Sequence, residues 1–189
     1  MIIGVTGNNG SGKDTFAQYL IDNKGFIHIS LSDFIREETI KRGLAPIRAN
    51  FREVGNSLRR DFGASVLSQR ALARMESGRD YVVTSIRNPE EAAALKGRNN
   101  FFLVAVAAPI ELRYDRIIKR NKQHEKEVVS FEEFKRLEDI ELESLSTSEQ
   151  QLNECIKMAD LAIPNDKDLA DFSHAIESAF EKIKTALGS

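Results

Sequence analysis

The stretch Gly-Asn-Asn-Gly-Ser-Gly-Lys-Asp-Thr, residues 7–15, decides how the rest of the chain is read. Gly7, Gly12 and Lys13 match the G-x-x-x-x-G-K part of a phosphate-binding loop, and the hydroxyl that usually follows the lysine comes one residue late, after Asp14. Glycines permit positive φ, so successive N–H groups can turn toward one anion, and the lysine adds a positive charge. We expect this loop to bind the phosphates of ATP through Gly7, Asn8, Asn9, Gly10, Ser11, Gly12, Lys13, Asp14 and Thr15.

The residues on either side of the loop support this prediction. Ile2, Ile3 and Val5 are β-formers directly before it, and residues 13–23 carry an apolar helical face directly after it. The N-terminus of a helix favours phosphate through its dipole and its unpaired N–H groups. The alternative is a glycine-rich turn that only connects a strand to a helix.

Composition limits the class of protein. The 189 residues are enough for one domain with a sizeable core. With 27 Lys and Arg against 29 Asp and Glu, the net charge of −2 argues against nucleic acid or an anionic membrane as partner. The single cysteine, Cys155, and the lack of a signal-peptide pattern at the N-terminus predict a cytoplasmic protein, and the apolar run 101–110 is too short to span a bilayer.

Short apolar runs of β-type alternate with helical patterns along the whole chain, which predicts a three-layer α/β/α fold with a five-stranded parallel sheet. The expected strands are 2–6, 26–30, 80–85, 101–107 and 160–164. The expected helices are 13–23, 32–43, 48–61, 64–77, 88–97, 109–121, 131–145, 148–157 and 168–187. Because ligands of such sheets bind at the carboxyl ends of the strands, residues just after each strand are the candidates for chemistry.

Two charged side chains follow the second strand. Asp33 and Arg36 lie one helical turn apart, so an acid for a metal or its water and a base for a phosphate can reach the cleft together. The alternative is an N-cap at Ser32 followed by ordinary first-turn charges. The next region, 46–78, is helical and rich in arginines, most of which we expect on the solvated face of their helices.

Arg87 follows the third strand and precedes a strong helix start, in which Asn88, Pro89 and Glu91 form a capping box with proline at the first helical position. A cation is unfavourable near the positive end of a helix dipole. We therefore expect Arg87 to bind an anionic group of a substrate, and the alternative is a salt bridge to a nearby acid.

The fourth strand leads to a helix with Arg113, Arg116 and Arg120 on one face, a polar stretch at 121–129 and a second helix. This arrangement suits a lid that excludes water during phosphoryl transfer, although a solvated helical hairpin has the same pattern. After the fifth strand, Asn165 is either a ligand of a nucleotide base or a turn residue.

Gly-Ser-Gly-Lys-Asp-Thr at 10–15, Ser-Ile-Arg-Asn-Pro-Glu-Glu at 85–91, the arginine helix, and Ala159-Asp160 with Asn165 resemble the nucleoside monophosphate kinase branch of the phosphate-loop kinases. The chain is also similar to the kinase-like domain fused to some deoxycytidylate deaminases, to an archaeal kinase-like family and, more distantly, to dephospho-coenzyme A kinases. The resemblance implies a single domain 1–189 with a core at 1–31, 79–112 and 146–189, a nucleotide-binding helical region at 32–78 and a lid at 113–136.

By the same resemblance, Lys13 holds the β- and γ-phosphates, Arg36 and Arg87 hold the acceptor phosphate, and Arg116 and Arg120 hold the transferring group. The family pattern has an acid at the end of the third strand, where this chain has Thr84, so magnesium is expected on Asp14, Thr15 or Asp33.

The predicted function is ATP- and Mg²⁺-dependent phosphorylation of a (deoxy)nucleoside monophosphate or a similar phosphorylated small molecule, by a monomer or homodimer. The alternatives are dephospho-coenzyme A kinase activity and an ATP-binding module without catalysis.

Overall fold

A computed structural model describes residues 1–123, 129–142 and 151–188. Its centre is a five-stranded, entirely parallel sheet, with strands in the order β2-β3-β1-β4-β5. The strands are β1 (Ile2–Thr6), β2 (Ile27–Ser30), β3 (Tyr81–Thr84), β4 (Phe101–Ala107) and β5 (Leu161–Pro164). The predicted α/β class and the five parallel strands are confirmed.

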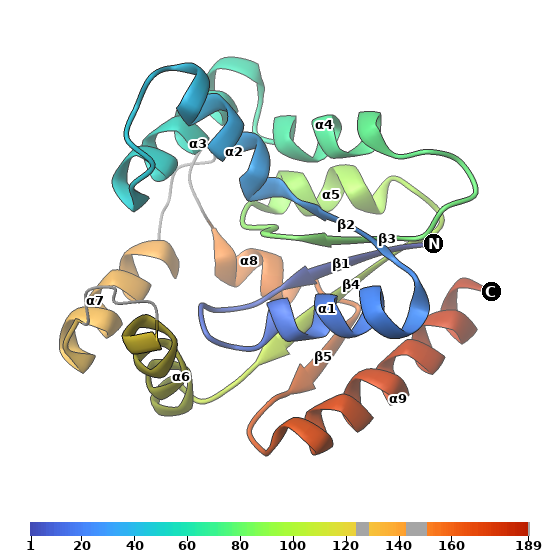
Figure 1. Cartoon of the computed structure of the whole chain (residues 1–189). Coiled ribbons are helices and arrows are strands. Elements are labelled where there is room, and N and C mark those ends of the chain that lie inside the picture. The colour runs from blue at the N-terminus through green and yellow to red at the C-terminus, as the bar shows by residue number, and fades with distance from the viewer. Residues whose placement is uncertain (124–128, 143–150, 189) are drawn as a thin grey trace.

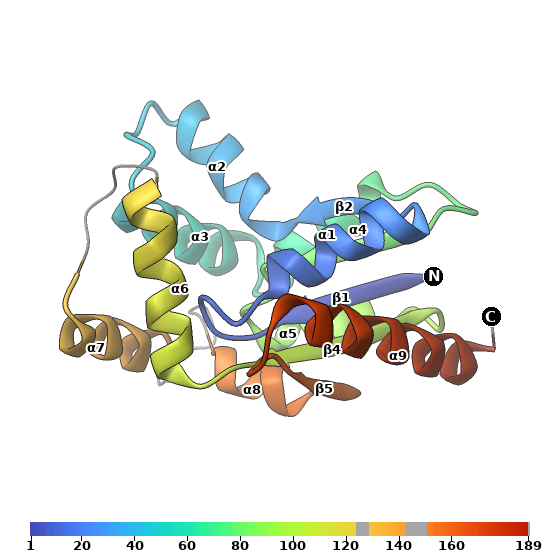
Figure 2. The same ribbon diagram turned by 60° about the horizontal axis from the view of Figure 1, so that its bottom comes forward.

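Helices cover both faces of the sheet, as Figures 1 and 2 show. One face is covered by α1 (Lys13–Lys24) and α9 (Leu169–Leu187), and the other by α4 (Val66–Arg74), α5 (Pro89–Lys96) and α8 (Leu152–Lys157). At the carboxyl ends of the strands, α2 (Leu31–Lys41) and α3 (Arg48–Phe62) lie opposite α6 (Ile110–Gln123) and α7 (Phe131–Leu142). Both termini are at the other end of the sheet (Figure 1).

The alternation of side chains along the strands divides the core into two layers. Ile3 and Val5 of β1 pack with Phe16 of α1 on one face, together with the buried side of α9. On the other face, Val83 and Leu103 pack with side chains of α3, α4, α5 and α8, and Cys155 lies among them. Burial raises the pKa of the Cys155 thiol to about 12. These layers hold the strand ends, and therefore the loops after them, in fixed positions.

Some predicted boundaries differ from the structure. The predicted helix 64–77 is shorter, as α4 covers Val66–Arg74. The helix after β2 begins at Leu31, with Ser30 rather than Ser32 at the N-cap position. Part of the predicted lid, 124–128, and residues 143–150 of two predicted helices lie outside the described residues.

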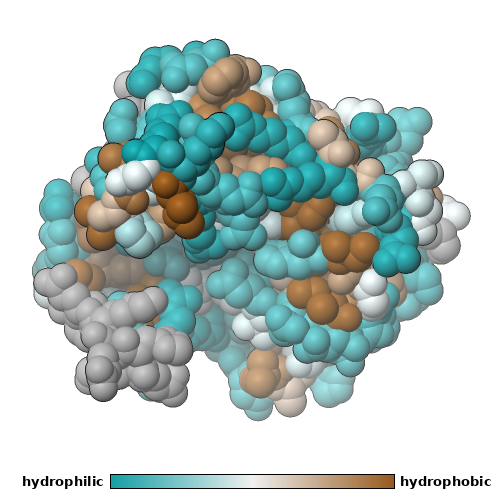
Figure 3. Space-filling view, turned by 45° about the horizontal axis from the view of Figure 1, so that its top comes forward, coloured by the Kyte–Doolittle hydropathy of each residue, from teal (hydrophilic) through white to brown (hydrophobic). Residues whose placement is uncertain are grey.

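Two surface properties bear on partners. Among the described residues, no helix combines the length and apolar character that crossing a membrane requires. Figure 3 shows a face that is mainly hydrophilic, on which the apolar residues form separate patches.

Candidate active site: a phosphate loop and an arginine-lined pocket

The loop between β1 and α1 needs its glycines because neighbouring elements approach it closely. Gly7 has φ 140°, and a Cβ there would lie 2.3 Å from the carbonyl oxygen of Val106 in β4. Gly12 has φ 105°, and a Cβ there would lie 2.2 Å from Nδ2 of Asn165, which follows β5. Both positions therefore exclude side chains for conformational and steric reasons. The loop is packed between the ends of two other strands.

Asn165 ties this loop to the end of β5. Its Nδ2 donates to the carbonyl oxygen of Ser11 at 2.8 Å, and its backbone N–H donates to that of Ala107 at 2.7 Å. Arg116 of α6 donates to the Asn165 carbonyl oxygen at 3.0 Å and to Oδ1 at 3.3 Å. Its other terminal nitrogen lies 3.5 Å from the carbonyl oxygen of Gly10. Asn165 and Arg116 thus meet at the outer side of the loop.

Arg113, which lies on α6 like Arg116, contacts the first part of the loop. It forms a buried, two-pronged ion pair with Glu138 of α7, with Nη2 and Oε2 2.7 Å apart. The same guanidinium donates to the carbonyl oxygens of Ala108 at 2.9 Å and Asn9 at 3.3 Å. Glu138 also accepts from Nδ2 of Asn8 at 3.2 Å. The pair therefore connects α6 and α7 to the loop.

Two groups of the loop are suited to an anion. Ser11 Oγ is buried and has no hydrogen-bond partner among the described residues, although buried hydroxyls usually have one. Lys13 Nζ donates to the Asn8 carbonyl oxygen at 3.1 Å, which holds the ammonium group across the loop. With α1 beginning at Lys13, the loop combines a buried hydroxyl that has no partner among the described residues, a lysine and a helix N-terminus, which fits a phosphate chain.

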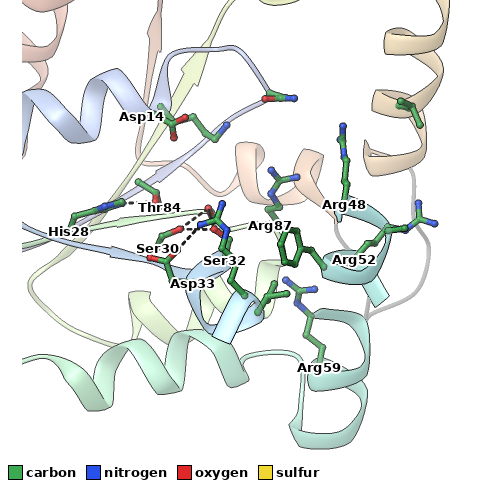
Figure 4. A pocket seen from close by; sticks show the side chains of 18 of the residues that line it. Asp14, His28, Ser30, Ser32, Asp33, Arg48, Arg52, Arg59, Thr84 and Arg87 are labelled. Atoms are coloured by element: carbon green, nitrogen blue, oxygen red, sulfur yellow. Dashed lines mark hydrogen bonds and ion pairs between the residues drawn. The ribbon is translucent and has the colours of Figure 1, made fainter. Parts of the chain in front are cut away.

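A cavity of about 700 Å³ opens beside the loop and extends toward α2 and α3 (Figure 4). Its lining is mainly cationic and hydroxylic: Asn9, Lys13, Asp14, His28, Ser30, Ser32, Asp33, Ile35, Arg36, Arg48, Ala49, Phe51, Arg52, Arg59, Thr84, Ser85, Arg87, Arg120 and Leu137. The loop residues Lys13 and Asp14 therefore share one cavity with Arg36, Arg87 and Arg120. Lys13 and Arg120 are 107 residues apart in the sequence. The fold brings them and the other three residues together because each of the five residues follows or faces the end of a strand.

Hydroxyl groups line the floor of the cavity. Ser30, Ser32 and Ser85 form a cluster with Oγ–Oγ distances of 2.8, 3.1 and 3.3 Å. Ser85 has φ 63°, and it is the only non-glycine residue with positive φ in the part of the chain that the structure describes. Such strain concentrates at functional sites. Beside the cluster, Nε2 of His28 and Oγ1 of Thr84 are 2.8 Å apart (Figure 4).

The turn that carries Arg87 is held by a buried carboxylate. Glu91 Oε2 accepts from the backbone N–H groups of Arg87 at 3.0 Å and Asn88 at 3.1 Å, which completes the predicted capping box. Glu91 Oε1 accepts from Nε of Arg59 at 2.8 Å, and Nη2 of Arg59 is also 2.8 Å from it. The expectation that the arginines of region 46–78 are solvated is therefore wrong for Arg59, which is 2% exposed.

The acids predicted for magnesium occupy different environments. Asp33 pairs with Arg36 at 2.6 Å, and both side chains are about half exposed. Asp14 and Asp33 both line the cavity, whereas Thr15 does not, and Asp14 and Thr15 are both exposed. Within the described ranges, His, Cys, Asp and Glu side chains form no group of three or more that could hold a metal. A Mg²⁺ ion bound with a nucleotide needs only one or two carboxylates, because phosphates and waters complete its shell. A single carboxylate such as that of Asp14 would therefore be enough for this role, and no preformed cage is needed.

Sequence reasoning missed several residues of this site. His28 was given no role, Glu91 was read only as a capping residue, and Glu138 and the serine cluster were not singled out. Arg59 and Glu91 are 32 residues apart and Arg113 and Glu138 are 25 apart, so no local spacing connects them. The sequence did contain one indication of a cationic pocket, which is the large number of arginines in 46–78, since three of them line the cavity.

The sequence of the chain matches known protein families. A family model described as an AAA domain (AAA_18) matches residues 3–144. The UPF0200 protein of Aeropyrum pernix is 31% identical over 172 residues, which cover 90% of this chain and 87% of that protein. The chain belongs to the AAA domain and UPF0200 families. The UPF0200 protein of Methanothrix thermoacetophila is 30% identical over 183 residues, 96% of this chain and 97% of that protein.

Solved structures share the fold of this UPF0200 protein. Shikimate kinase from Bacteroides thetaiotaomicron aligns with a TM-score of 0.62 at 15% identity, over 97% of this chain and 98% of that one. TT1252 from Thermus thermophilus aligns with a TM-score of 0.60 at 24% identity, over 96% and 97% of the two chains. A gluconokinase from Sinorhizobium meliloti aligns with a TM-score of 0.59 at 13% identity, over 98% and 94%. The chain therefore has a P-loop kinase-like fold.

Proposed function

We propose that this UPF0200 protein transfers the γ-phosphoryl group of ATP to a (deoxy)nucleoside monophosphate or a similar phosphorylated small molecule. One observation carries the proposal: the phosphate loop and a set of arginines from four other segments line the same cavity. Phosphoryl transfer requires the two substrates to be positioned and their charge neutralised more than it requires covalent chemistry. A cavity with a phosphate loop at one side and arginines at the other meets that requirement.

Each predicted residue receives a role in this proposal. Lys13 binds the β- and γ-phosphates, and Arg36 and Arg87 bind the phosphate of the acceptor. Arg120 reaches the transferring group from α6, since it lines the cavity. Arg116 acts through the loop, which its contacts with Gly10 and Asn165 support.

The proposed division of the chain follows the same logic. Residues 32–78 form the acceptor-binding region and residues 113–136 form the lid, because these segments supply the arginines that face the loop from either side. We place the protein in the cytoplasm.

Asp14 is the proposed ligand of Mg²⁺ or of its bound water, and Asp33 is the second candidate acid. The ion would neutralise phosphate charge when bound. Replacing Asp14 with alanine should raise the Mg²⁺ concentration needed for half-maximal activity several-fold, which a magnesium titration measures. An unchanged magnesium requirement would leave Asp14 as an ordinary first-turn acid of α1.

The test of the proposed function is acceptor-dependent formation of ADP. ATP and Mg²⁺ are incubated with a panel of ribo- and deoxynucleoside monophosphates and with dephospho-coenzyme A, with shikimate and gluconate as acceptors without phosphate. We expect ADP to form with a phosphorylated acceptor only. ADP formation with shikimate or gluconate alone would contradict a phosphorylated acceptor, and ADP formation with dephospho-coenzyme A alone would select that alternative activity.

A second candidate is an ATP-binding module without transferase activity. The observation that favours it is Thr84, whose hydroxyl is paired with His28 where the kinase pattern has an acid. Tight ATP binding together with no product from any acceptor would support this candidate and exclude the first.

A further inference from the structure

Arg59 has a polar group that the protein leaves without a partner at the wall of the cavity. Its side chain is 1% exposed, and its Nε and Nη2 both contact Oε1 of Glu91. The remaining nitrogen, Nη1, is buried and has no hydrogen-bond partner among the described residues. Arg59 is nevertheless one of the residues that line the cavity, and Figure 4 shows its guanidinium directed into it. A buried, unpartnered N–H costs free energy, which an acceptor atom of a ligand would recover by binding to it.

The charge of Arg59 determines what kind of ligand atom it can bind. The carboxylate of Glu91, which is fully buried, neutralises the guanidinium at 2.8 Å. For a phosphate placed against Nη1, the carboxylate of Glu91 on the other side of the guanidinium would offset much of the attraction to Arg59. The pair therefore presents N–H groups without net charge, and the atom that suits them is a neutral acceptor such as a carbonyl oxygen.

The surroundings of Arg59 indicate where that oxygen lies on the substrate. Ile35 and the aromatic ring of Phe51 line the same cavity, which provides apolar surface for a flat ring. Arg59 lies across the cavity from Asp14 in Figure 4, with Arg87 between them. An acceptor whose phosphate is near Arg87 and the loop would therefore present the far edge of its ring to Arg59.

We propose that Arg59 is a specificity-determining residue that reads a carbonyl oxygen on the far edge of the acceptor base, O6 of a purine or O4 of a pyrimidine. This inference rests on the proposed function and narrows it to 6-oxo and 4-oxo nucleotides. An amino group at the same position of the base is itself a hydrogen-bond donor. It would face the N–H donor of Arg59 Nη1 and leave that buried N–H unpaired.

Matched pairs of ligands test the proposal by direct binding. Isothermal titration calorimetry compares dIMP with dAMP, and dUMP with dCMP, since each pair differs mainly in an oxo or amino group at that edge. The wild-type protein should bind the oxo member of each pair at least about tenfold more tightly. The Arg59→Lys variant keeps a cation for Glu91 but lacks Nη1, and it should lose this preference. Arg60→Lys, on the exposed side of the same helix, is the control and should keep it.

The outcomes separate this inference from the proposed function. Equal binding of oxo and amino members, a preference that survives in Arg59→Lys, or no binding of any of the four nucleotides would overturn the inference. If Arg59→Lys fails to fold, as judged by circular dichroism, the wild-type ratios decide alone. Selective binding of oxo nucleotides without ADP formation would overturn the kinase proposal and support the role of Arg59, whereas ADP formation with equal use of dAMP and dIMP would do the reverse.

Discussion

Two buried arginine–glutamate pairs, Arg113–Glu138 and Arg59–Glu91, differ in how completely the protein satisfies the hydrogen-bond donors of the arginine. In both, the glutamate also accepts a hydrogen bond from a loop that follows a strand: Glu138 accepts from Nδ2 of Asn8, and Glu91 accepts from the backbone N–H of Arg87. The arginine of the first pair, Arg113, distributes its remaining N–H groups over the carbonyl oxygens of Ala108 and Asn9. Arg59 leaves Nη1 without a partner among the described residues.

The difference concerns the two arginines and not the whole of the two walls. Hydrogen bonds from Asn165, Arg116 and Arg113 hold the backbone of the phosphate loop, but Ser11 Oγ in that loop, like Nη1 of Arg59, has no partner among the described residues. At the wall formed by α3, Nη1 of Arg59 is a hydrogen-bond donor without a partner among the described residues. Such a donor suits recognition of a variable group, because a ligand without an acceptor at that point leaves the buried donor unpaired and binds more weakly.

Breaking the pair at α3 should give the largest effect on stability. Glu91→Ala leaves Arg59 buried without its carboxylate and removes the acceptor for two backbone N–H groups, so we expect a loss of about 3–5 kcal/mol in the free energy of unfolding. Urea denaturation measures it. The control is Glu90→Ala, an exposed residue of the same first turn, which should cost below about 1 kcal/mol. Similar losses for the two variants would show that the buried pair has no special role.

Removing the cation of the loop should produce the largest effect on activity at the donor side. Lys13→Ala should lower kcat/KM for ATP about 100- to 1,000-fold, because one charge-stabilising donor is lost from the transferring phosphates. Its melting temperature should stay close to that of the wild type, since the side chain is only partly buried and donates to a carbonyl oxygen within its own loop, that of Asn8. Near-normal turnover in this variant would refute the kinase assignment.

Arg87 probes the acceptor side without disturbing the donor side. Arg87→Ala removes the side chain but keeps the backbone N–H that donates to Glu91. The KM for the acceptor should rise about 10- to 100-fold, as expected for a lost hydrogen bond to a charged group, while the KM for ATP changes little. Steady-state kinetics with each substrate varied in turn separates the two. An equal loss of both affinities would argue that the donor and acceptor sides are not independent.

An exposed pair provides the reference for the smallest effect. Arg74 donates to Glu37 at 3.1 and 2.8 Å, and this hydrogen bond lowers the pKa of Glu37. A lowered folded-state pKa contributes stability above the unfolded-state pKa, and the contribution is lost as the pH falls through the folded-state value. Arg74→Ala should raise the pKa of Glu37 toward the ordinary value of a glutamate, as an NMR titration would show.

Salt distinguishes this surface pair from the buried ones. Raising the ionic strength should reduce the pKa shift of Glu37 in the wild type, because both side chains are more than half exposed. Glu133, whose pKa is lowered by Arg136 on its own helix, should titrate identically in the Arg74 variant. A change at Glu133 would mean that the substitution acts through the whole fold.

Much of the architecture could be predicted from the chain itself. The loop at residues 7–15, the capping box at Asn88 and the alternation of strands and helices each depend on neighbours a few residues apart, and the five parallel strands are confirmed. The same local reasoning placed Lys13, Arg36, Arg87 and Arg120 near strand ends, and these residues line one cavity. It misjudged Arg59, because helical spacing cannot distinguish a solvated arginine from one that meets a glutamate 32 residues later.

The sequence by itself predicted a phosphate-binding loop on an α/β sheet, since glycines, lysine and the flanking periodicities act locally. Only the tertiary structure decided which charges are paired, that Asn165 and Arg116 hold the loop together, and that Arg59 keeps one nitrogen available. The physical reason is that pairing, burial and orphaned donors are properties of contacts between segments. In this molecule those contacts form where the strand ends and the helices around them converge.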